Sequence, residues 1–308
     1  LDFEQVLTSD REAISEPMVI PISIGLLDEH GKDLIETKVF ELKKSKDTIT
    51  FDGINKKPTV SLLRNFSAPI IIERAITEKD RLSLLKKDSD AYNRWDAAQQ
   101  LMFTSFEKIA IEKQEANDDI IGAFCDIMQD QKLMPAFRAQ LLSQPSVSEI
   151  ITHFFEKDLS TDPEKIYSAK KIFTKKLAES SNPFLEQLFH SLAQNFEYEP
   201  SANQVGERSC KNILLGILTK LDNGETAQKQ FSGADNMTDE VAALSVLIQN
   251  DIATTEIEKF YDKWSDDRLV IDKWFMLQSS LSQPSKALKI TKMLTNHSDF
   301  NEKNPNRF

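Results

Sequence analysis

The 308-residue sequence is poor in cysteine, glycine and histidine, and each shortage excludes a class of structure or site. The two cysteines, Cys125 and Cys210, are too few for a disulfide framework, and each lies in an apolar helical pattern. This favours two buried free thiols of a reducing compartment, with a disulfide or a reactive thiol as the alternatives. The eight glycines form no cluster of the kind that cradles a phosphate group.

Long apolar runs and excess positive charge are also missing. No run of about 18 apolar residues occurs, so no membrane span is predicted. The net charge of −11 argues against nucleic acid as a partner, because phosphate binding needs basic patches. Residues 1–10 carry neither the basic nor the apolar region of a signal peptide, although a fragment would have lost its own N-terminus. Together with the cysteine content, this leads us to expect a cytoplasmic protein.

The first 75 residues show the alternation of short strands. In residues 18–27 the isoleucines and Leu26 fall on one face, while Pro21, Ser23 and Gly25 fall on the other. A small antiparallel, Ig-like β-sandwich is therefore predicted for residues 1–75. Because 75 residues are few for a whole sandwich, we expect early strands to be missing from this chain. Further strands are predicted at residues 34–42, 48–51, 59–63 and 70–73.

From residue 76 onwards the apolar residues recur with helical spacing. The stripe that begins at Trp95 and ends at Ile109 predicts one long helix, and another is predicted to open with Asn182 as its cap and Pro183 in its first turn. Short polar connections between helices favour an all-α superhelix of armadillo or HEAT type over residues 76–308. Ile166, Ile172, Phe173 and Leu177 form another apolar stripe, and later helices are predicted at residues 202–221, 238–249, 254–261, 267–278 and 285–295.

Several sharper signals have plain structural explanations, which we favour. Trp95 is expected in the core, and Asp96 is expected to satisfy free backbone N–H groups near a helix start. Asn236 is expected to cap a helix. The lysines at 170, 171, 175 and 176 are expected on a solvated helix face. The aromatic residues between 260 and 275, which include Trp264 and Trp274, are expected to pack between helices rather than to form a binding cage.

Four short segments, in this order and spacing, resemble bacterial aminopeptidase N. They are residues 93–99 (NRWDAAQ), 236–244 (NMTDEVAAL), 272–278 (DKWFMLQ) and 304–307 (NPNR), and residues 67–69 (SAP) near the end of the predicted sandwich agree with them. That family is a zinc metallo-aminopeptidase of the gluzincin class. The resemblance implies the C-terminal part of such an enzyme: the end of its β-sandwich domain and most of its helical domain, which would be truncated at its C-terminal end.

The zinc-binding motif of that family is missing from this chain. His-Glu-x-x-His would place two imidazoles one helical turn apart, but His30, His153, His190 and His297 are never so close in sequence, and none is followed by glutamate. The family's Gly-x-Met-x-Asn segment is also missing. We therefore expect no catalytic residue and no metal ligand here. Zinc is expected in the parent enzyme and not in this fragment, which alone should be inactive.

The resemblance implies a non-catalytic role for the chain. The helical part would cap the enzyme's own catalytic domain and restrict peptide access to its chamber. Arg307, in the NPNR segment, is the candidate for a contact with a substrate carboxylate, and a helix-end contact is its structural alternative. The alternative function is a freestanding helical scaffold that binds a protein or peptide partner on its concave face.

Overall fold

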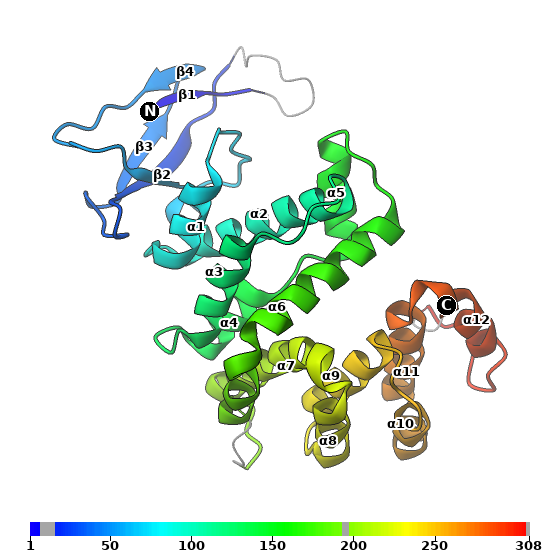
Figure 1. Cartoon of the computed structure of the whole chain (residues 1–308). Helices are drawn as coiled ribbons and strands as arrows, with labels where there is room; N and C mark the ends of the chain where they lie inside the picture. Colours follow the sequence, from blue (N-terminus) through cyan, green and yellow to red (C-terminus); the bar gives the residue numbers. More distant parts are fainter. Residues whose placement is uncertain (7–15, 193–196, 306–308) are drawn as a thin grey trace.

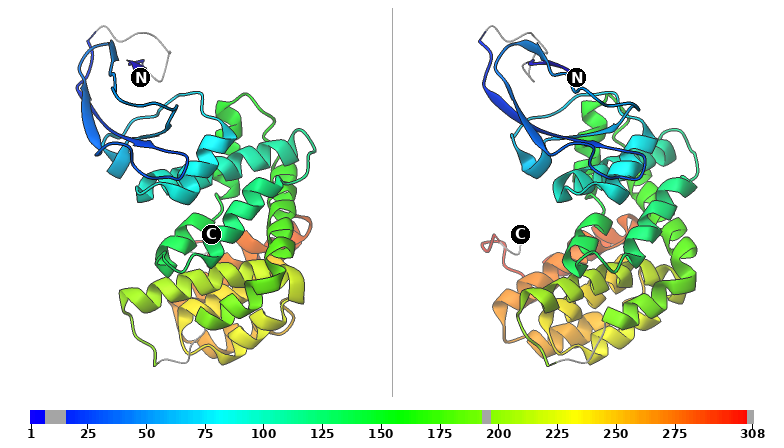
Figure 2. Two further views of the ribbon diagram at one scale, coloured as in Figure 1. Left: turned by 60° about the vertical axis from the view of Figure 1, so that its left-hand side comes forward. Right: turned by 90° about the vertical axis from the view of Figure 1, so that its left-hand side faces the viewer.

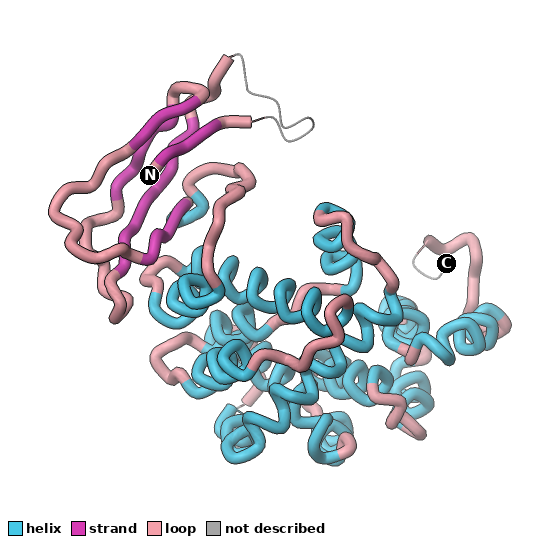
Figure 3. The backbone as a smooth tube through the Cα atoms, turned by 45° about the horizontal axis from the view of Figure 1, so that its top comes forward, coloured by secondary structure: helices cyan, strands magenta, loops and turns pink. Residues whose placement is uncertain are grey.

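The computed structural model describes residues 1–6, 16–192 and 197–305, and it consists of a β part followed by a helical part. All the strands of the described residues lie before residue 63, and from Glu78 onwards every regular element is a helix. Figure 1 and Figure 3 show the strands gathered at one end of the molecule. Figure 2 shows the helices stacked one after another beneath them.

Two small antiparallel sheets make up the β part. Strand β2 (Ile20–Leu27) is the centre of a three-stranded sheet, with β3 (Lys38–Leu42) on one side and β5 (Thr59–Leu62) on the other. Strand β1 (Asp2–Glu4) pairs with β4 (Lys46–Thr48), and Phe3 lies opposite Asp47. The predicted strand at residues 48–51 is therefore wrong beyond its first residue.

From Ile22 onwards the central strand β2 is buried on both faces rather than on one, while Pro21 is exposed. Ile20, Ile22, Ile24 and Leu26 lie in the core as predicted, but the opposite face is covered as well. The reason is a side chain that lies across it: a Cβ atom added to Gly25 would be 2.0 Å from Cζ of Arg64. A half-buried strand was therefore the wrong expectation for this segment.

The segment at residues 70–73 is not a strand, contrary to the prediction. Ile70 and Ile72 pack against the β core, while Ile71 between them is 77% exposed. The alternating isoleucines thus attach a connecting segment to the sheet, although this segment does not pair with a strand as β2 and β5 do. This segment leads from the β part to the first helix.

Twelve α-helices follow within the described residues. The predicted helices from residue 202 onwards correspond to α7, α9, α10, α11 and α12, with ends shifted by up to three residues. The full set is α1 (Glu78–Lys87), α2 (Ala91–Ala110), α3 (Asp118–Gln129), α4 (Pro135–Leu142), α5 (Val147–Glu156), α6 (Pro163–Leu192), α7 (Ala202–Asp222), α8 (Glu225–Gly233), α9 (Met237–Gln249), α10 (Glu256–Trp264), α11 (Arg268–Leu281) and α12 (Pro284–Thr295).

One continuous hydrophobic core runs through the helical part, from Leu27 at the end of β2 to Leu294 in α12. Phe173 of α6 is central to its first half. The rings of Phe106 in α2 and Phe124 in α3 pack edge-on against Phe173, with centroid distances of 5.5 and 5.9 Å. Neighbouring helices therefore share side chains, which is how a helical repeat buries apolar faces that no single helix can bury.

Helix α6 runs through the point at which the sequence predicted a new helix. Pro183 lies inside it rather than in a first turn. Buried side chains on both sides of the proline, Phe173 and Leu177 before it and Leu185 and Phe189 after it, face the same core. This packing outweighs the loss of one backbone hydrogen bond at the proline.

The lysine face of α6 is only partly solvated. Lys171 and Lys175 are exposed, as predicted, but Nζ of Lys170 donates a hydrogen bond to the carbonyl oxygen of Pro145. Burial lowers the pKa of Lys170 to about 8. Ile172, which was assigned to an apolar stripe, is 45% exposed.

Candidate functional site

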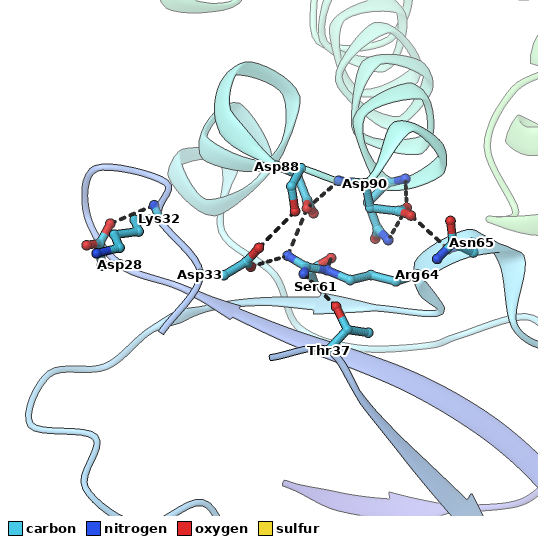
Figure 4. Close-up of polar contacts among 11 residues, drawn as sticks. Asp28, Lys32, Asp33, Thr37, Ser61, Arg64, Asn65, Asp88 and Asp90 are labelled. Atoms are coloured by element: carbon cyan, nitrogen blue, oxygen red, sulfur yellow. Dashed lines mark hydrogen bonds and ion pairs between the residues drawn. The ribbon is translucent and has the colours of Figure 1, made fainter. Parts of the chain in front are cut away.

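The junction between the β part and helices α1 and α2 is the most densely bonded polar region that joins the two parts. Its centre is Arg64, in the one-turn 3₁₀ helix η1 (Arg64–Phe66) that follows β5. Figure 4 shows the side chains that converge on it from the sheet, from the loop before β3 and from the end of α1. This site sets the orientation of α1 and α2 relative to the sheet.

The guanidinium of Arg64 makes four hydrogen bonds although it is almost completely buried. Its Nη2 donates to Oδ1 of Asp33 at 2.6 Å and to Oδ1 of Asp88 at 3.0 Å. Its Nη1 donates to Oγ1 of Thr37 and its Nε to Oγ of Ser61, both at 3.0 Å. The side chain of Arg64 is 3% exposed and that of Asp88 is 0% exposed. Arg64 thus joins strand β5, the loop before β3 and the C-terminal end of α1.

The charges in this cluster depend on one another. Burial raises the pKa of the Asp88 carboxyl, and the positive charge of Arg64 offsets only part of that effect. At Asp33 burial also disfavours the charged form, but hydrogen bonds from Arg64 and Ser89 outweigh it and lower the pKa of that carboxyl. A buried ion pair of this kind is costly to break, because either partner alone is an uncompensated charge.

The start of α2 is bonded to the same turn. Oδ1 of Asp90 accepts a hydrogen bond from the backbone N–H of Asn93 at 2.9 Å, which caps the helix, and Oδ2 accepts one from the backbone N–H of Asn65 at 2.8 Å. Asp90 is therefore the cap of this helix. The expectation that Asp96 plays this role is wrong, because α2 begins at Ala91 and Asp96 lies beyond its first turn.

The backbone of the junction turn is strained. Leu63, Asn65 and Phe66 have φ angles of 56°, 56° and 52°, in the left-handed region that non-glycine residues rarely adopt. Conformations of this kind cost of order 1–3 kcal/mol each and persist only where the surroundings impose them. Here the Arg64 and Asp90 hydrogen bonds impose them.

The apolar side chains of the two parts also meet at the junction. Leu27 of β2 is fully buried in the helical core, and Tyr92 of α2 packs against the β core. The Tyr92 ring lies 5.1 Å from that of Phe66 and 6.0 Å from that of Trp95, measured between centroids. Trp95 is half-buried at the edge of the core, whereas the rest of its predicted stripe is buried. Shared cores and the polar cluster together make the junction rigid.

The sequence segments that carry the resemblance have structural roles. In residues 93–99, Nδ2 of Asn93 donates to Oδ1 of Asp90 at 2.9 Å, and Nε2 of Gln99 donates to the carbonyl oxygen of Ser143 at 3.1 Å. In the sandwich segment, Oγ of Ser67 accepts a hydrogen bond from the backbone N–H of Ser23 at 2.9 Å. Two of the segments therefore lie at the junction itself.

The segment at residues 236–244 connects helices farther along the chain. The side chain of Asn236 accepts a hydrogen bond from the backbone N–H of Asp239 at 3.0 Å, which confirms the predicted cap of α9. Asp239 is ion-paired with Lys211 of α7, and Oε1 of Glu240 lies 2.9 Å from Nζ of Lys263 in α10. Both carboxylates are buried, and their pairing links α9 to α7 and to α10.

The aromatic residues of the third segment pack between helices, as predicted. Nε1 of Trp274 donates to the carbonyl oxygen of Ile257 at 2.9 Å, and its ring lies 5.1 Å from that of Tyr261. His297 joins them, at 5.1 Å from both rings, and no sequence pattern indicated this contact. Cys125 and Cys210 are buried and free, in agreement with the favoured prediction of two buried free thiols.

Arg307 lies outside the described residues, so its contacts are not part of this structure. Among the residues that are described, no three or more histidine, cysteine, aspartate or glutamate side chains form a group that could hold a metal ion. The described residues therefore offer no cluster that would fit a zinc ion. Within the same part of the chain no helix is both long and apolar enough to cross a membrane.

The Arg64 cluster was not found from the sequence. Arg64, Asp33 and Asp88 are far apart along the chain and follow no spacing rule, because their meeting depends on how the sheet and α1 dock. One local signal was present: Ser89 and Asp90 directly before an apolar helical pattern indicate a helix cap.

Comparisons with known proteins place this arrangement in a family. Residues 1–75 match the model of a domain of unknown function with an Ig-like fold (DUF3458), and residues 78–308 match a domain of unknown function described as ARM repeats (DUF3458_C). The chain is 30% identical over 316 residues to aminopeptidase N of Escherichia coli strain K12, which covers 96% of this chain and 35% of that protein. Aminopeptidase N of Caulobacter vibrioides is 30% identical over 296 residues, which covers 92% of this chain and 33% of that protein.

A solved structure agrees with these relatives. The crystal structure of Legionella pneumophila aminopeptidase A in complex with aspartic acid matches 100% of this chain and 38% of its own chain, with a TM-score of 0.83 and 25% identity. The chain thus spans about a third of the length of the relatives that it matches. The matches confirm the predicted fold class and the resemblance to bacterial aminopeptidase N. The chain belongs to the family of the DUF3458_C ARM-repeat domain, here preceded by the Ig-like DUF3458 domain.

Proposed function

We propose that this chain is the non-catalytic C-terminal part of a zinc-dependent aminopeptidase, which removes N-terminal residues from peptides. The relatives named aminopeptidase N support this, because nearly the whole of this chain is similar to about a third of each of them. The lack of a His-Glu-x-x-His motif supports the non-catalytic role. Zinc and the reacting groups would belong to the catalytic domain of the parent protein, in the cytoplasm.

The role of the chain in that enzyme would be to shape access to the catalytic chamber. The observation that carries this proposal is the rigid junction, in which the buried Arg64 joins sheet and helices and Leu27 enters the helical core. A cap that restricts entry has to be held at a fixed position, since a freely swinging one would admit folded proteins as well as flexible peptides. The partners of the chain would thus be its own catalytic domain and the peptides that pass it.

This role can be tested in the full-length protein with a loosened junction. In Arg64→Met, release of the N-terminal residue from a folded protein substrate should rise relative to hydrolysis of an alanyl arylamide, which is small enough to enter either way. Phe260→Leu, a core change in α10 away from the junction, is the control for a general loss of stability. Equal changes for both substrates in Arg64→Met would contradict the access role.

Arg307 remains the proposed contact with substrate. A cation that meets the carboxylate of a peptide equally in the ground and transition states affects KM and leaves kcat nearly unchanged. Full-length Arg307→Ala should therefore raise KM for free peptides several-fold, or by about 1 kcal/mol for a partly solvated contact. Arylamides carry no carboxylate and are the control. Equal losses for both substrate types would show that Arg307 supports the fold instead.

A further inference from the structure

A cavity of about 310 Å³ lies beside the junction, between the connecting segment after the sheet and the first turns of α2. Apolar residues of β5, the connecting segment, α1 and α2 form most of its lining, but polar atoms make up most of the surface that faces the cavity. Small-molecule sites are commonly cavities of about this size, and they favour domain interfaces. The apolar wall includes Leu62, Ile70, Ile72, Ile76, Leu84 and Ala97.

Three charged side chains also line the cavity: Arg74, Arg81 and Asp96. They come from the connecting segment, α1 and α2 respectively. Nη1 of Arg74 donates to the carbonyl oxygen of Val60 at 2.8 Å, and Nη1 of Arg81 lies 3.5 Å from Oγ1 of Thr104. Each guanidinium has five N–H donors, so these contacts leave most of them available to a ligand.

Asp96 interacts with Gln100 and with the charges of Arg74 and Arg81, but it has neither of the roles that Asp88 and Asp90 have at the junction. Asp96 is half-buried, it does not cap α2, and within the described residues it forms no ion pair of 4.0 Å or less with either arginine. Burial raises the pKa of its carboxyl, and a hydrogen bond with Gln100 and the charges of Arg74 and Arg81 lower it only partly. A half-buried carboxylate that faces two cations across a cavity is arranged for a ligand that carries both charges.

We infer that this cavity binds a free apolar α-amino acid. The α-carboxylate lies against the guanidinium groups of Arg74 and Arg81, the α-ammonium group against the carboxylate of Asp96, and the side chain against Ile70 and Ile72. Both charges of the zwitterion are then compensated, and its apolar side chain is removed from water. The inference goes beyond the proposed function, since it concerns a site built from this chain's own residues.

The test is a titration of the purified 308-residue chain followed by backbone amide NMR shifts. L-leucine should bind saturably and shift the amides around Asp96 and Gln100. Two analogues each lack one charge: 4-methylpentanoate has no ammonium group, and 3-methylbutylamine has no carboxylate. Both should bind at least about tenfold more weakly, since a hydrogen bond to a charged group contributes roughly 1.5–3 kcal/mol. Equal binding of leucine and 4-methylpentanoate, or no saturable binding of leucine, would overturn the inference.

Three variants assign the binding to this cavity. Asp96→Asn keeps the shape and removes the charge, and it should weaken leucine binding about tenfold or more. Arg74 is exposed, so Arg74→Gln should leave the fold intact and weaken binding as well. Glu258→Gln, an exposed change in α10, is the control and should bind like the original chain. Unchanged affinity in the first two variants would place any leucine site elsewhere. Because no catalysis is measured, this test can fail independently of the proposed function.

Discussion

At the scale of single residues, Arg64 stabilises two carboxylates that burial would otherwise disfavour in their charged form. Oδ1 of Asp88 accepts hydrogen bonds from Nη2 of Arg64 and from the backbone N–H of Asp90, both at 3.0 Å. Because burial raises the folded-state pKa of Asp88 above its ordinary value of 3.8, the charged form costs stability as the pH rises above 3.8. Arg64 limits that cost at neutral pH.

Removing Arg64 alone should therefore be much worse than removing the ion pair. Arg64→Met leaves Asp88 charged and buried, and it should lower the free energy of unfolding at pH 7 by about 3–5 kcal/mol. Adding Asp88→Asn should restore part of that loss, because the amide is neutral and keeps an oxygen that can accept the Asp90 N–H. Urea unfolding of both single variants and the double variant measures the coupling. Strictly additive effects would contradict this account of the junction.

Glu107 joins α2 to α5 in a second, smaller polar contact. Its Oε1 lies 2.6 Å from Nε2 of His153 and 2.5 Å from Nζ of Lys157, and the His153 ring stacks on Phe103 at 4.2 Å. Burial raises the pKa of the Glu107 carboxyl, but the hydrogen bonds with His153 and Lys157 outweigh it and hold the pKa below its usual 4.5. The contact is thus present above pH 4.5 and is lost as the pH falls through the lowered value.

Glu107→Gln should accordingly have a pH-dependent effect. At pH 7 the loss in the free energy of unfolding should be about 1–2 kcal/mol, and near pH 3 the variant and the original chain should differ little. Glu186→Gln is the matched control, since its partner His190 lies 3.8 Å away and both side chains are exposed. Such surface pairs contribute about 0–1 kcal/mol. A Glu107→Gln loss of the same size at both pH values would contradict the assignment.

At the scale of elements, the sequence predicted the helices whose residue pattern depends on near neighbours along the chain. Helices α7, α9, α10, α11 and α12 follow from apolar spacing and from caps such as Asn236, which depend only on neighbouring residues, whereas α8 was not predicted. The predictions failed where tertiary packing decides. Ile70 and Ile72 have the alternation of a strand, yet they attach a connecting segment to the sheet. The Arg64 cluster could not be predicted, because its three charged members meet only after the sheet docks on α1.

Helix α6 offers a direct test at this scale. If Pro183 began a new helix, it would be at a favourable position, and replacing it would be neutral or harmful. Inside a continuous helix it leaves one carbonyl without its donor. Pro183 is exposed, so Pro183→Ala should raise the free energy of unfolding by about 1–3 kcal/mol without loss of packing. Thermal unfolding of the variant distinguishes the two outcomes.

At the scale of the whole molecule, the chain is an Ig-like domain rigidly joined to a curved stack of helices (Figure 2). Two kinds of contact hold it together: the hydrophobic core, which continues from helix to helix, and buried ion pairs between elements that pack against each other. This arrangement suits a part that positions and restricts rather than one that reacts. The chemistry of the proposed enzyme would then lie wholly outside these 308 residues.

The most direct test of the central claim compares zinc content and activity in two purified proteins. One is this chain, and the other is the full-length product of its gene. The chain should hold no stoichiometric zinc and release no chromophore from alanyl or leucyl arylamides, because it lacks His-Glu-x-x-His. The full-length protein should bind zinc and hydrolyse both. One equivalent of zinc and turnover in the 308-residue chain alone would contradict the account.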